Sequence, residues 1–295
     1  MNLRRLEVAC PAKLNFLLYV TGKRGDGYHE LLSLAAPVAY GDKLEGVLKQ
    51  DSVEDVLTCN DAKLPTGDDN LVLKAVAAFR RRATLSLSIH LHLTKRVPVG
   101  AGLGGGSSDA ASTLLILNAL APRPLDQKTL REAAAEVGSD VPLFLGEGPV
   151  IMRGRGEVID PVPRKVHEYM AGRRFFIFKP EFSVDTAWAY GQLAEAGAYD
   201  TPETARKRIR TFLDDPYSGL EPCYNIFESV VFHKYRVYKA LADALEREGF
   251  PRFYLSGSGS SCFMPSPEAG YGQRLRALFR EYLGESAFVI ETQVV

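Results

Sequence analysis

The clearest periodicity in the chain is a strict alternation of apolar and polar positions over residues 85–95, LSLSIHLHLTK. Successive side chains of a strand point to opposite faces, so this pattern predicts a strand with one apolar and one polar face. His90 and His92 lie on the polar face and have the spacing of a metal-binding pair. Because no third ligand accompanies them, we interpret them as part of a polar strand face.

The other elements are predicted from two periods, period 2 for strands and about 3.6 residues for helices. Period-2 or continuous apolar runs predict strands over 3–20 (broken at Pro11), 31–48, 175–180, 252–266 (with a glycine turn inside) and 286–295. Helical spacing predicts helices over 70–83, 107–120, 126–138, 186–197, 225–249 and 268–283, and the irregular segment 197–222 is expected to hold one more. Mixed strands and helices with antiparallel-type alternation indicate an α+β fold.

The length of 295 residues favours two domains. Residues 153–173 are charged, contain prolines and have weak periodicity, as expected of a junction. We therefore expect domains at 1–157 and 158–295, and the last strand can pack back on the first domain.

Net charge, the lengths of apolar runs and the spacing of cysteines narrow the class of protein to which this chain can belong. The 36 basic and 36 acidic residues balance, so the chain carries no net-charge signature of a nucleic-acid-binding protein. No apolar run reaches the ~18 residues that span a bilayer, and Glu7 and Lys13 interrupt any signal-peptide core. Cys10, Cys59, Cys223 and Cys262 form no C-x-x-C pair, which favours reduced thiols and a cytoplasmic protein.

A glycine-rich stretch, PVGAGLGGGSS, follows the alternating strand at residues 98–108. Gly100, Gly102 and Gly105 match the dinucleotide fingerprint, but a strand feeding that loop should be almost wholly apolar, and the acidic residue about 20 positions later, Asp126, falls at a helix start. The Walker A pattern fails because Gly106 occupies the lysine position. Both interpretations are rejected.

The remaining interpretation is an anion site made of backbone. A glycine-rich turn that enters a helix offers unpaired N–H groups and the positive end of the helix dipole. Ser107 or Ser108 is expected to cap that helix, and Asp109 should point away from bound phosphate. The alternative, a tight turn with close packing, explains two or three of the glycines rather than all five.

Four motifs give this chain a family resemblance. PVGAGLGGGSSDAA resembles the phosphate-binding loop of the GHMP kinases, and PAKLNFLLYVTGKRGDGYHE, GSDVPLFL and SGSGSSCF resemble three further segments of that family in the same order. Gly27-Tyr28-His29 is typical of the branch acting on 4-diphosphocytidyl-2-C-methyl-D-erythritol (CDP-ME) in the non-mevalonate isoprenoid pathway. At 225–228, NIFE stands where the family usually has N-D-L-E.

The resemblance implies a nucleotide-binding α+β domain followed by a ferredoxin-like α+β domain, with ATP and Mg²⁺ as cofactors and CDP-ME as the small-molecule partner. It also implies a set of ATP-binding residues: Pro98, Val99, Gly100, Ala101, Gly102, Leu103, Gly104, Gly105, Gly106, Ser107 and Ser108 in the loop, with Asn70 and Lys95 at the adenine. The metal ligands are not identified, although Ser108 is a candidate Mg²⁺ contact.

For catalysis, the resemblance makes Asp140 the base for the attacking hydroxyl and places Lys13 beside it. An ammonium would keep the carboxylate ionised and stabilise the developing alkoxide. Without the resemblance, Asp140 is an equally good N-cap before Val141-Pro142, and Lys13 is an ordinary strand lysine.

The same resemblance assigns the substrate side. Asn15 shares a strand face with Lys13, Tyr28 and His29 hold the cytosine, and Thr186 and Tyr190 lie one helical turn apart, with Tyr190 closing the base pocket. Gly257 and Gly259 form either a turn over the substrate or a plain hairpin. Two rival functions remain open: another GHMP kinase of mevalonate or homoserine type, and a non-catalytic nucleotide sensor.

Overall fold

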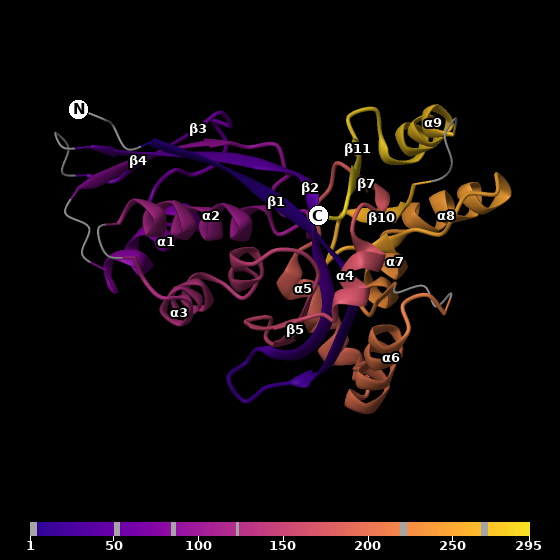
Figure 1. Ribbon diagram of the computed structural model, residues 1–295. Helices are drawn as coiled ribbons and strands as arrows, with labels where there is room; N and C mark the ends of the chain where they lie inside the picture. Colours follow the sequence, from indigo (N-terminus) through magenta and orange to yellow (C-terminus); the bar gives the residue numbers. More distant parts are fainter. Residues whose placement is uncertain (1–4, 50–53, 84–86, 122–123, 219–222, 267–270) are drawn as a thin grey trace.

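The computed structural model describes residues 5–49, 54–83, 87–121, 124–218, 223–266 and 271–295, which form two β-sheets with helices packed against them (Figure 1). The α+β class is confirmed. The first sheet has the order β3-β4-β2-β1-β8, and a hairpin of β5 and β6 is added to β2. Its strands are β1 (Arg5–Lys23), β2 (His29–Lys49), β3 (Val56–Cys59), β4 (Ser88–Thr94), β5 (Val150–Gly154), β6 (Val158–Pro161) and β8 (Tyr224–Asn225).

The β1–β2 hairpin is the longest feature of the first sheet, and in Figure 1 its turn lies beside β5. The expected break at Pro11 is wrong. β1 continues through Pro11, and a shift in register between Pro11 and Ala12 accommodates the residue that has no N–H to donate. From Ala12 to Val20 the strand is buried throughout, so even polar side chains there lie inside the protein.

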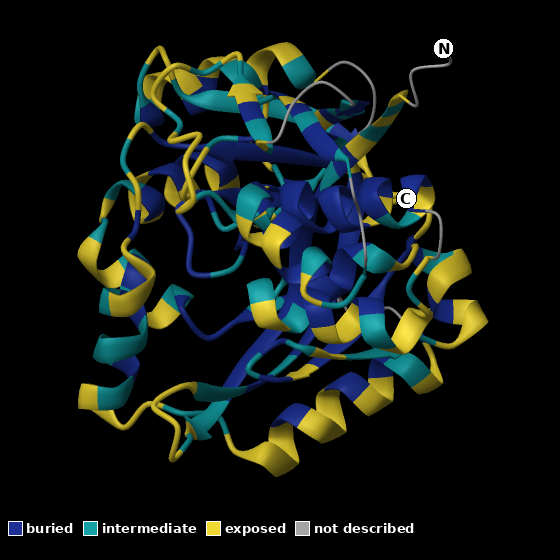
Figure 2. Cartoon of the chain, turned by 90° about the vertical axis from the view of Figure 1, so that its left-hand side faces the viewer, coloured by how far each residue is buried: buried dark blue, intermediate teal, exposed yellow. Residues whose placement is uncertain are grey.

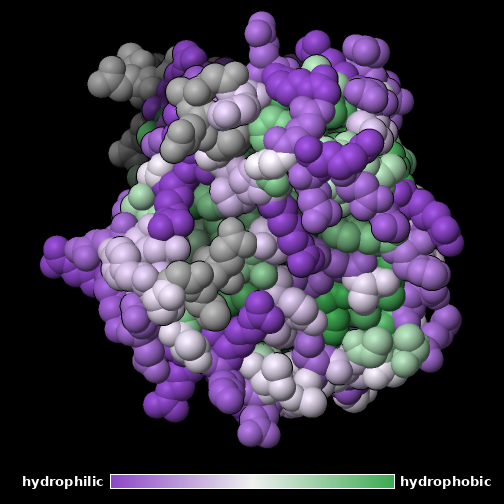
Figure 3. Space-filling view, turned by 90° about the vertical axis from the view of Figure 1, so that its right-hand side faces the viewer, coloured by the Kyte–Doolittle hydropathy of each residue, from purple (hydrophilic) through white to green (hydrophobic). Residues whose placement is uncertain are grey.

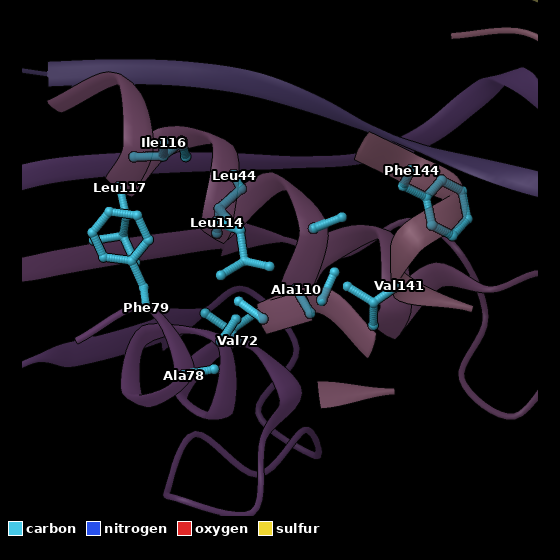
Figure 4. Packing of buried hydrophobic residues seen from close by; sticks show 14 of the residues in the cluster. Leu44, Val72, Ala78, Phe79, Ala110, Leu114, Ile116, Leu117, Val141 and Phe144 are labelled. Carbon is cyan, nitrogen blue, oxygen red and sulfur yellow. The ribbon is translucent and has the colours of Figure 1, made fainter. Parts of the chain in front are cut away.

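Helices α1 (Leu71–Arg80), α2 (Gly105–Leu120) and α3 (Gln127–Val137), with the 3₁₀ helix η1 (Val141–Leu145), accompany the first sheet. Figure 4 shows their packing, with Leu114 and Leu117 of α2 between Phe79 of α1 and Leu44 of β2. The expected serine cap of α2 is wrong. The helix begins at Gly105, and its N-cap is Gly104 in the left-handed conformation (φ 68°), which glycine adopts without strain.

The second sheet has the order β11-β7-β10-β9 and is antiparallel throughout. It contains β7 (Arg174–Lys179), β9 (Tyr254–Leu255), β10 (Cys262–Pro265) and β11 (Phe288–Gln293), with helices between β7 and β9 and between β10 and β11. This is the ferredoxin-like arrangement. The helices in the second half of the chain are α4 (Arg164–Met170), α5 (Thr186–Ala196), α6 (Pro202–Asp214), α7 (Glu228–Lys234), α8 (Val237–Arg247) and α9 (Gly272–Leu283), of which α6 contacts β1 and β2 of the first sheet.

The expected single helix over 225–249 is wrong. The chain forms the short strand β8, then α7, and then α8 after a break at Tyr235 and Arg236. Tyr235 leaves the helical conformation (φ −101°, ψ 80°), and its ring stacks on Phe182 at a centroid distance of 4.4 Å. The helical pattern continues in the sequence beyond Tyr235, but the helix itself ends there, where the ring of Tyr235 packs against Phe182.

Elements from both halves of the chain meet at the junction of the two sheets. Phe16 of β1 packs edge-on against Phe175 and Phe263 of the second sheet, at 5.2 and 5.3 Å between centroids. β8 adds to the first sheet, and Val294 after β11 bridges to Val38 of β2. The β5–β6 hairpin spans residue 157, so the division at that residue stays a proposal.

The surface and interior separate as expected of a globular protein. Figure 2 shows buried strands and inner helix faces beneath exposed outer helix faces, and Figure 3 shows a largely hydrophilic face over the second half of the chain. Among the described helices, none has both the length and the apolar character of a membrane span.

Candidate active site

A pocket of 760 Å³ lies where the two halves of the chain meet. It is lined by the residues predicted for catalysis and for substrate binding: Lys13, Asn15, Tyr28, His29, Asp140, Thr186 and Tyr190. These positions come from β1, the β1–β2 turn, the start of β2, the residue before η1, and α5. The structure therefore brings together residues that are widely separated in the sequence. We call this the acceptor pocket.

Lys13 and Asp140 face each other in this pocket. The Nζ of Lys13 is 3.7 Å from Oδ2 of Asp140, and the exposed fractions of the two side chains are 4% and 35%. Burial lowers the pKa of Lys13, and the neighbouring Asp140 opposes that shift. Asp140 precedes η1 but makes no side-chain capping bond, so its carboxylate is turned toward the lysine instead of serving as a cap.

Lys13 is oriented by a short chain of buried polar groups. Its Nζ donates to Oδ1 of Asn15, which agrees with the expectation that both side chains share a strand face. Nδ2 of Asn15 donates to Oγ of Ser33 (2.9 Å), and that hydroxyl donates to a backbone carbonyl of β1 (2.7 Å). Ser33 carries no sequence signal for this role, because its contact depends on the register of β2 against β1.

The glycine loop lines a second pocket of 370 Å³, which we call the loop pocket. Asn70, Lys95 and every loop residue from Pro98 to Ser107 line it. Gly102 and Gly104 also line the acceptor pocket, so the two pockets meet at these glycines. Ser108 is fully buried and lines neither pocket, and its candidate contact with Mg²⁺ stays a prediction.

Close packing accounts for some of the glycines. A Cβ on Gly102 would lie 2.1 Å from the carbonyl oxygen of Ser256, and one on Gly104 would lie 2.9 Å from the Lys13 side chain. Both have positive φ. A Cβ on Gly106 would meet its nearest atom, in the side chain of Leu71, at 3.4 Å. The tight-turn alternative therefore applies to Gly102 and Gly104, whereas Gly106 has room for a side chain.

The second glycine turn, residues 256–261, connects β9 to β10 and also lines the acceptor pocket through Gly257 and Ser258. The hairpin interpretation is confirmed, and the interpretation as a turn over the substrate stays a prediction. It is held against the glycine loop, because Oγ of Ser256 donates to the carbonyl of Gly102 (3.1 Å). Asn225 fixes it from behind, donating to the carbonyl of Gly257 at 2.8 Å.

Lys95 lies at the loop pocket, but its ammonium is bound by two carboxylates. Its Nζ is 2.6 Å from Asp42 and 2.8 Å from Asp109. Burial alone would lower the pKa of Lys95, and the two carboxylates raise it instead. Burial raises the pKa of Asp109 to about 7, against the effect of Lys95. The carboxylate of Asp109 is thus paired with Lys95, although Asp109 also lines the loop pocket, so its expected orientation away from bound phosphate stays a prediction. Asn70, by contrast, caps α1 by accepting from the backbone of Val72.

Three aromatic residues that were expected to hold the base, Tyr28, His29 and Tyr190, line the acceptor pocket. His29 stacks on Tyr190 with centroids 4.6 Å apart, so one face of Tyr190 is covered. Tyr28 is 51% exposed, and the guanidinium of Arg155 lies 5.1 Å from its ring. Thr186 makes a hydroxyl contact of 2.8 Å with Ser258. Sequence reasoning did not identify Arg155 as a site residue.

The histidine pair of β4 lies outside both pockets. Nδ1 of His92 is 2.9 Å from the hydroxyl of Thr58. Within the described ranges, no three His, Cys, Asp or Glu side chains are grouped as metal ligands would be.

A strand–glycine loop–helix unit, a ferredoxin-like second half and two joined pockets define a kinase of the GHMP class, and the family of GHMP kinase N-terminal domains matches residues 70–148. A 4-diphosphocytidyl-2-C-methyl-D-erythritol kinase from Protochlamydia amoebophila (strain UWE25) is 39% identical over 258 residues, covering 88% of this chain and 83% of the relative. The chain belongs to the family of 4-diphosphocytidyl-2-C-methyl-D-erythritol kinases, which makes it an ATP-dependent small-molecule kinase.

Other comparisons agree. The relative of the same name from Chlorobium phaeobacteroides (strain BS1) is 34% identical, over 95% of this chain and 96% of its own. A crystal structure of a 4-(cytidine 5'-diphospho)-2C-methyl-D-erythritol kinase superposes with a TM-score of 0.75 at 30% identity, covering 98% of this chain and all of the other. Homoserine kinase from Cytophaga hutchinsonii has a TM-score of 0.70 at 18% identity, a likeness of fold alone.

Proposed function

We propose that this protein transfers the γ-phosphoryl group of ATP to the C2 hydroxyl of CDP-ME. The observation that carries the proposal is the position of the Lys13–Asp140 pair, which lines the acceptor pocket beside the glycines that both pockets share. ATP in the loop pocket and an alcohol in the acceptor pocket would then meet at that pair. Tyr28 and His29 line the same pocket and are suited to a pyrimidine base.

The proposed reaction is a single in-line displacement. Asp140 accepts the proton of the C2 hydroxyl as its oxygen bonds to the γ-phosphorus, and the bond from that phosphorus to the β–γ bridging oxygen breaks, so that ADP leaves with the electron pair. The ammonium of Lys13 stabilises the negative charge that develops on the attacking oxygen. Backbone N–H groups at the start of α2 bind the phosphates of ATP.

Mg²⁺ fits the oxygen donors of this site. It prefers one or two protein oxygens and completes its shell with water and phosphate. Ser107 lines the loop pocket, so its hydroxyl would hold the ion together with water and phosphate oxygens. Mg²⁺ would neutralise charge on the transferred phosphate.

Consumption of ATP with CDP-ME, mevalonate, homoserine or buffer alone tests the proposal. We expect turnover with CDP-ME only. Turnover with mevalonate or homoserine instead would assign the chain to another branch of the GHMP kinases. Nucleotide binding without turnover on any acceptor would identify a sensor.

Replacing Tyr28 with alanine should raise the KM for CDP-ME by roughly 5- to 150-fold, the value of one base stacked on an aromatic ring. The KM for ATP should not change, because Tyr28 does not line the loop pocket. Tyr271→Ala is a matched control, since Tyr271 is 54% exposed and lines neither pocket. Steady-state kinetics on both variants decide the matter, and an unchanged KM for CDP-ME in Tyr28→Ala would remove this ring from the base site.

A further inference from the structure

The acceptor pocket carries more positive charge than the proposed phosphoryl transfer uses. Its charged lining residues are Lys13, Lys23, Asp140 and Arg155. Lys13 and Asp140 offset each other across 3.7 Å. Lys23 and Arg155 belong to none of the ion pairs among the described residues. The proposed phosphoryl transfer uses only Lys13 and Asp140. Lys23 and Arg155 are therefore two further cations that face the pocket without a carboxylate partner in the part of the chain that the structure describes.

Arg155 is held in place from two sides. Its Nη2 donates to the backbone carbonyl of Ala135 in α3 (2.9 Å), and its guanidinium lies over the ring of Tyr28. Glu157 is nearby, but its carboxylate accepts from the backbone N–H of Arg155 and not from the side chain. The guanidinium is thus fixed without being neutralised, and most of its five donors remain for a ligand.

The position of Arg155 matches a particular part of the ligand. The proposed function puts the base at Tyr28 and the reacting alcohol at Asp140, and both residues line the acceptor pocket together with Ser139 and Arg155. Arg155 contacts Tyr28 on one side, and the residue after it, Gly156, approaches Ser139 on the other, with 3.4 Å from an ideal Cβ to Ser139. A group bound by Arg155 would therefore lie between the base and the acceptor alcohol.

We infer that Arg155 is a specificity-determining residue that binds the diphosphate linking the nucleoside to the acceptor alcohol, with Lys23 as the second cation. This rests on the proposed function. A planar guanidinium is well suited to bidentate binding of phosphate oxygens, and two cations match the two negative charges of a diphosphate diester. Arg155 thereby makes the pocket select a nucleoside diphosphate derivative over an uncharged polyol or a bare nucleoside.

The test compares the binding of cytidine and CDP by calorimetry, using the full chain with the loop pocket saturated by ADP. In wild type, CDP should bind more tightly than cytidine. In Arg155→Gln, the ratio of the two affinities should fall by about tenfold or more, while cytidine binding stays close to wild type. Arg155→Lys should give a ratio of CDP to cytidine affinity between those of wild type and Arg155→Gln. If Arg155→Gln does not fold, Arg155→Lys is compared with wild type instead.

Arg153→Gln is the matched control, because Arg153 is exposed on β5, pairs with Asp160 and lines neither pocket. The ratio of its affinities for CDP and cytidine should equal that of wild type. If Arg155→Gln weakens cytidine and CDP equally, the residue only supports the ring of Tyr28, and the inference is overturned. It is also overturned if neither affinity changes. A wild-type protein that binds neither compound would refute the proposed function itself and this inference with it.

Discussion

Replacing Asp140 with asparagine is expected to lower kcat by about 10²–10⁴-fold while the KM for ATP stays near wild type. Asparagine keeps the size of the side chain but cannot accept the proton of the acceptor hydroxyl. It also removes the negative partner of Lys13, which lies 3.7 Å away. Nucleotide affinity should be retained, because Asp140 lines the acceptor pocket and not the loop pocket.

The matched control for this variant is Asp126→Asn. Asp126 is a true helix cap, since its side chain accepts from the backbone of Thr129 at the start of α3. Asparagine is also a good cap, so this variant should keep both kcat and stability. Single-turnover kinetics and thermal melting of both variants separate the two roles. If Asp140→Asn melts well below wild type and loses ATP affinity together with kcat, Asp140 is a structural residue.

The sequence predicted the parts of this site that depend on local spacing. Lys13 and Asn15 are two apart on a strand, so their shared face followed directly. The helical spacing of Thr186 and Tyr190 predicted one shared helix face, and the family resemblance assigned both residues to the substrate pocket, which they line. For Asp140 the sequence alone left two roles open, because capping depends on a side-chain direction that spacing does not determine. The 3.7 Å contact with Lys13 joins residues that lie far apart in the sequence, so local spacing does not predict it.

Long-range contacts account for what the sequence did not predict. Lys95 was expected at the adenine and lines the loop pocket, but the pairing of its ammonium with Asp42 on β2 was not predicted, because that pairing depends on the register of β2 against β4. Tyr190 was expected to close the base pocket and lines it, but its stacking on His29 was not predicted. The periodicity of 225–249 is helical, yet the chain bends at Tyr235 where tertiary packing overrides local preference.

Replacing Gly102 with alanine should destabilise the protein by roughly 2–5 kcal/mol, which is a large part of the ~5–15 kcal/mol that stabilises a typical domain. Two causes act together. The residue has a φ of 75°, and the new Cβ would lie 2.1 Å from the carbonyl oxygen of Ser256. A backbone atom cannot rotate away as a flexible side chain can, so the glycine loop and the second glycine turn must separate.

Gly106→Ala distinguishes this packing role from anion binding. Gly106 has no positive φ, and a Cβ there would first meet the side chain of Leu71 at 3.4 Å. The free energy of unfolding of the Gly106→Ala variant should therefore stay within about 1 kcal/mol of wild type or rise slightly, because alanine is favoured over glycine in a helix. The KM for ATP should nevertheless rise, because a methyl group would stand where phosphate approaches the backbone. Urea denaturation and ATP kinetics on both variants provide the measurement. An unchanged KM for ATP in Gly106→Ala would mean that these glycines serve packing alone and that phosphate binds elsewhere.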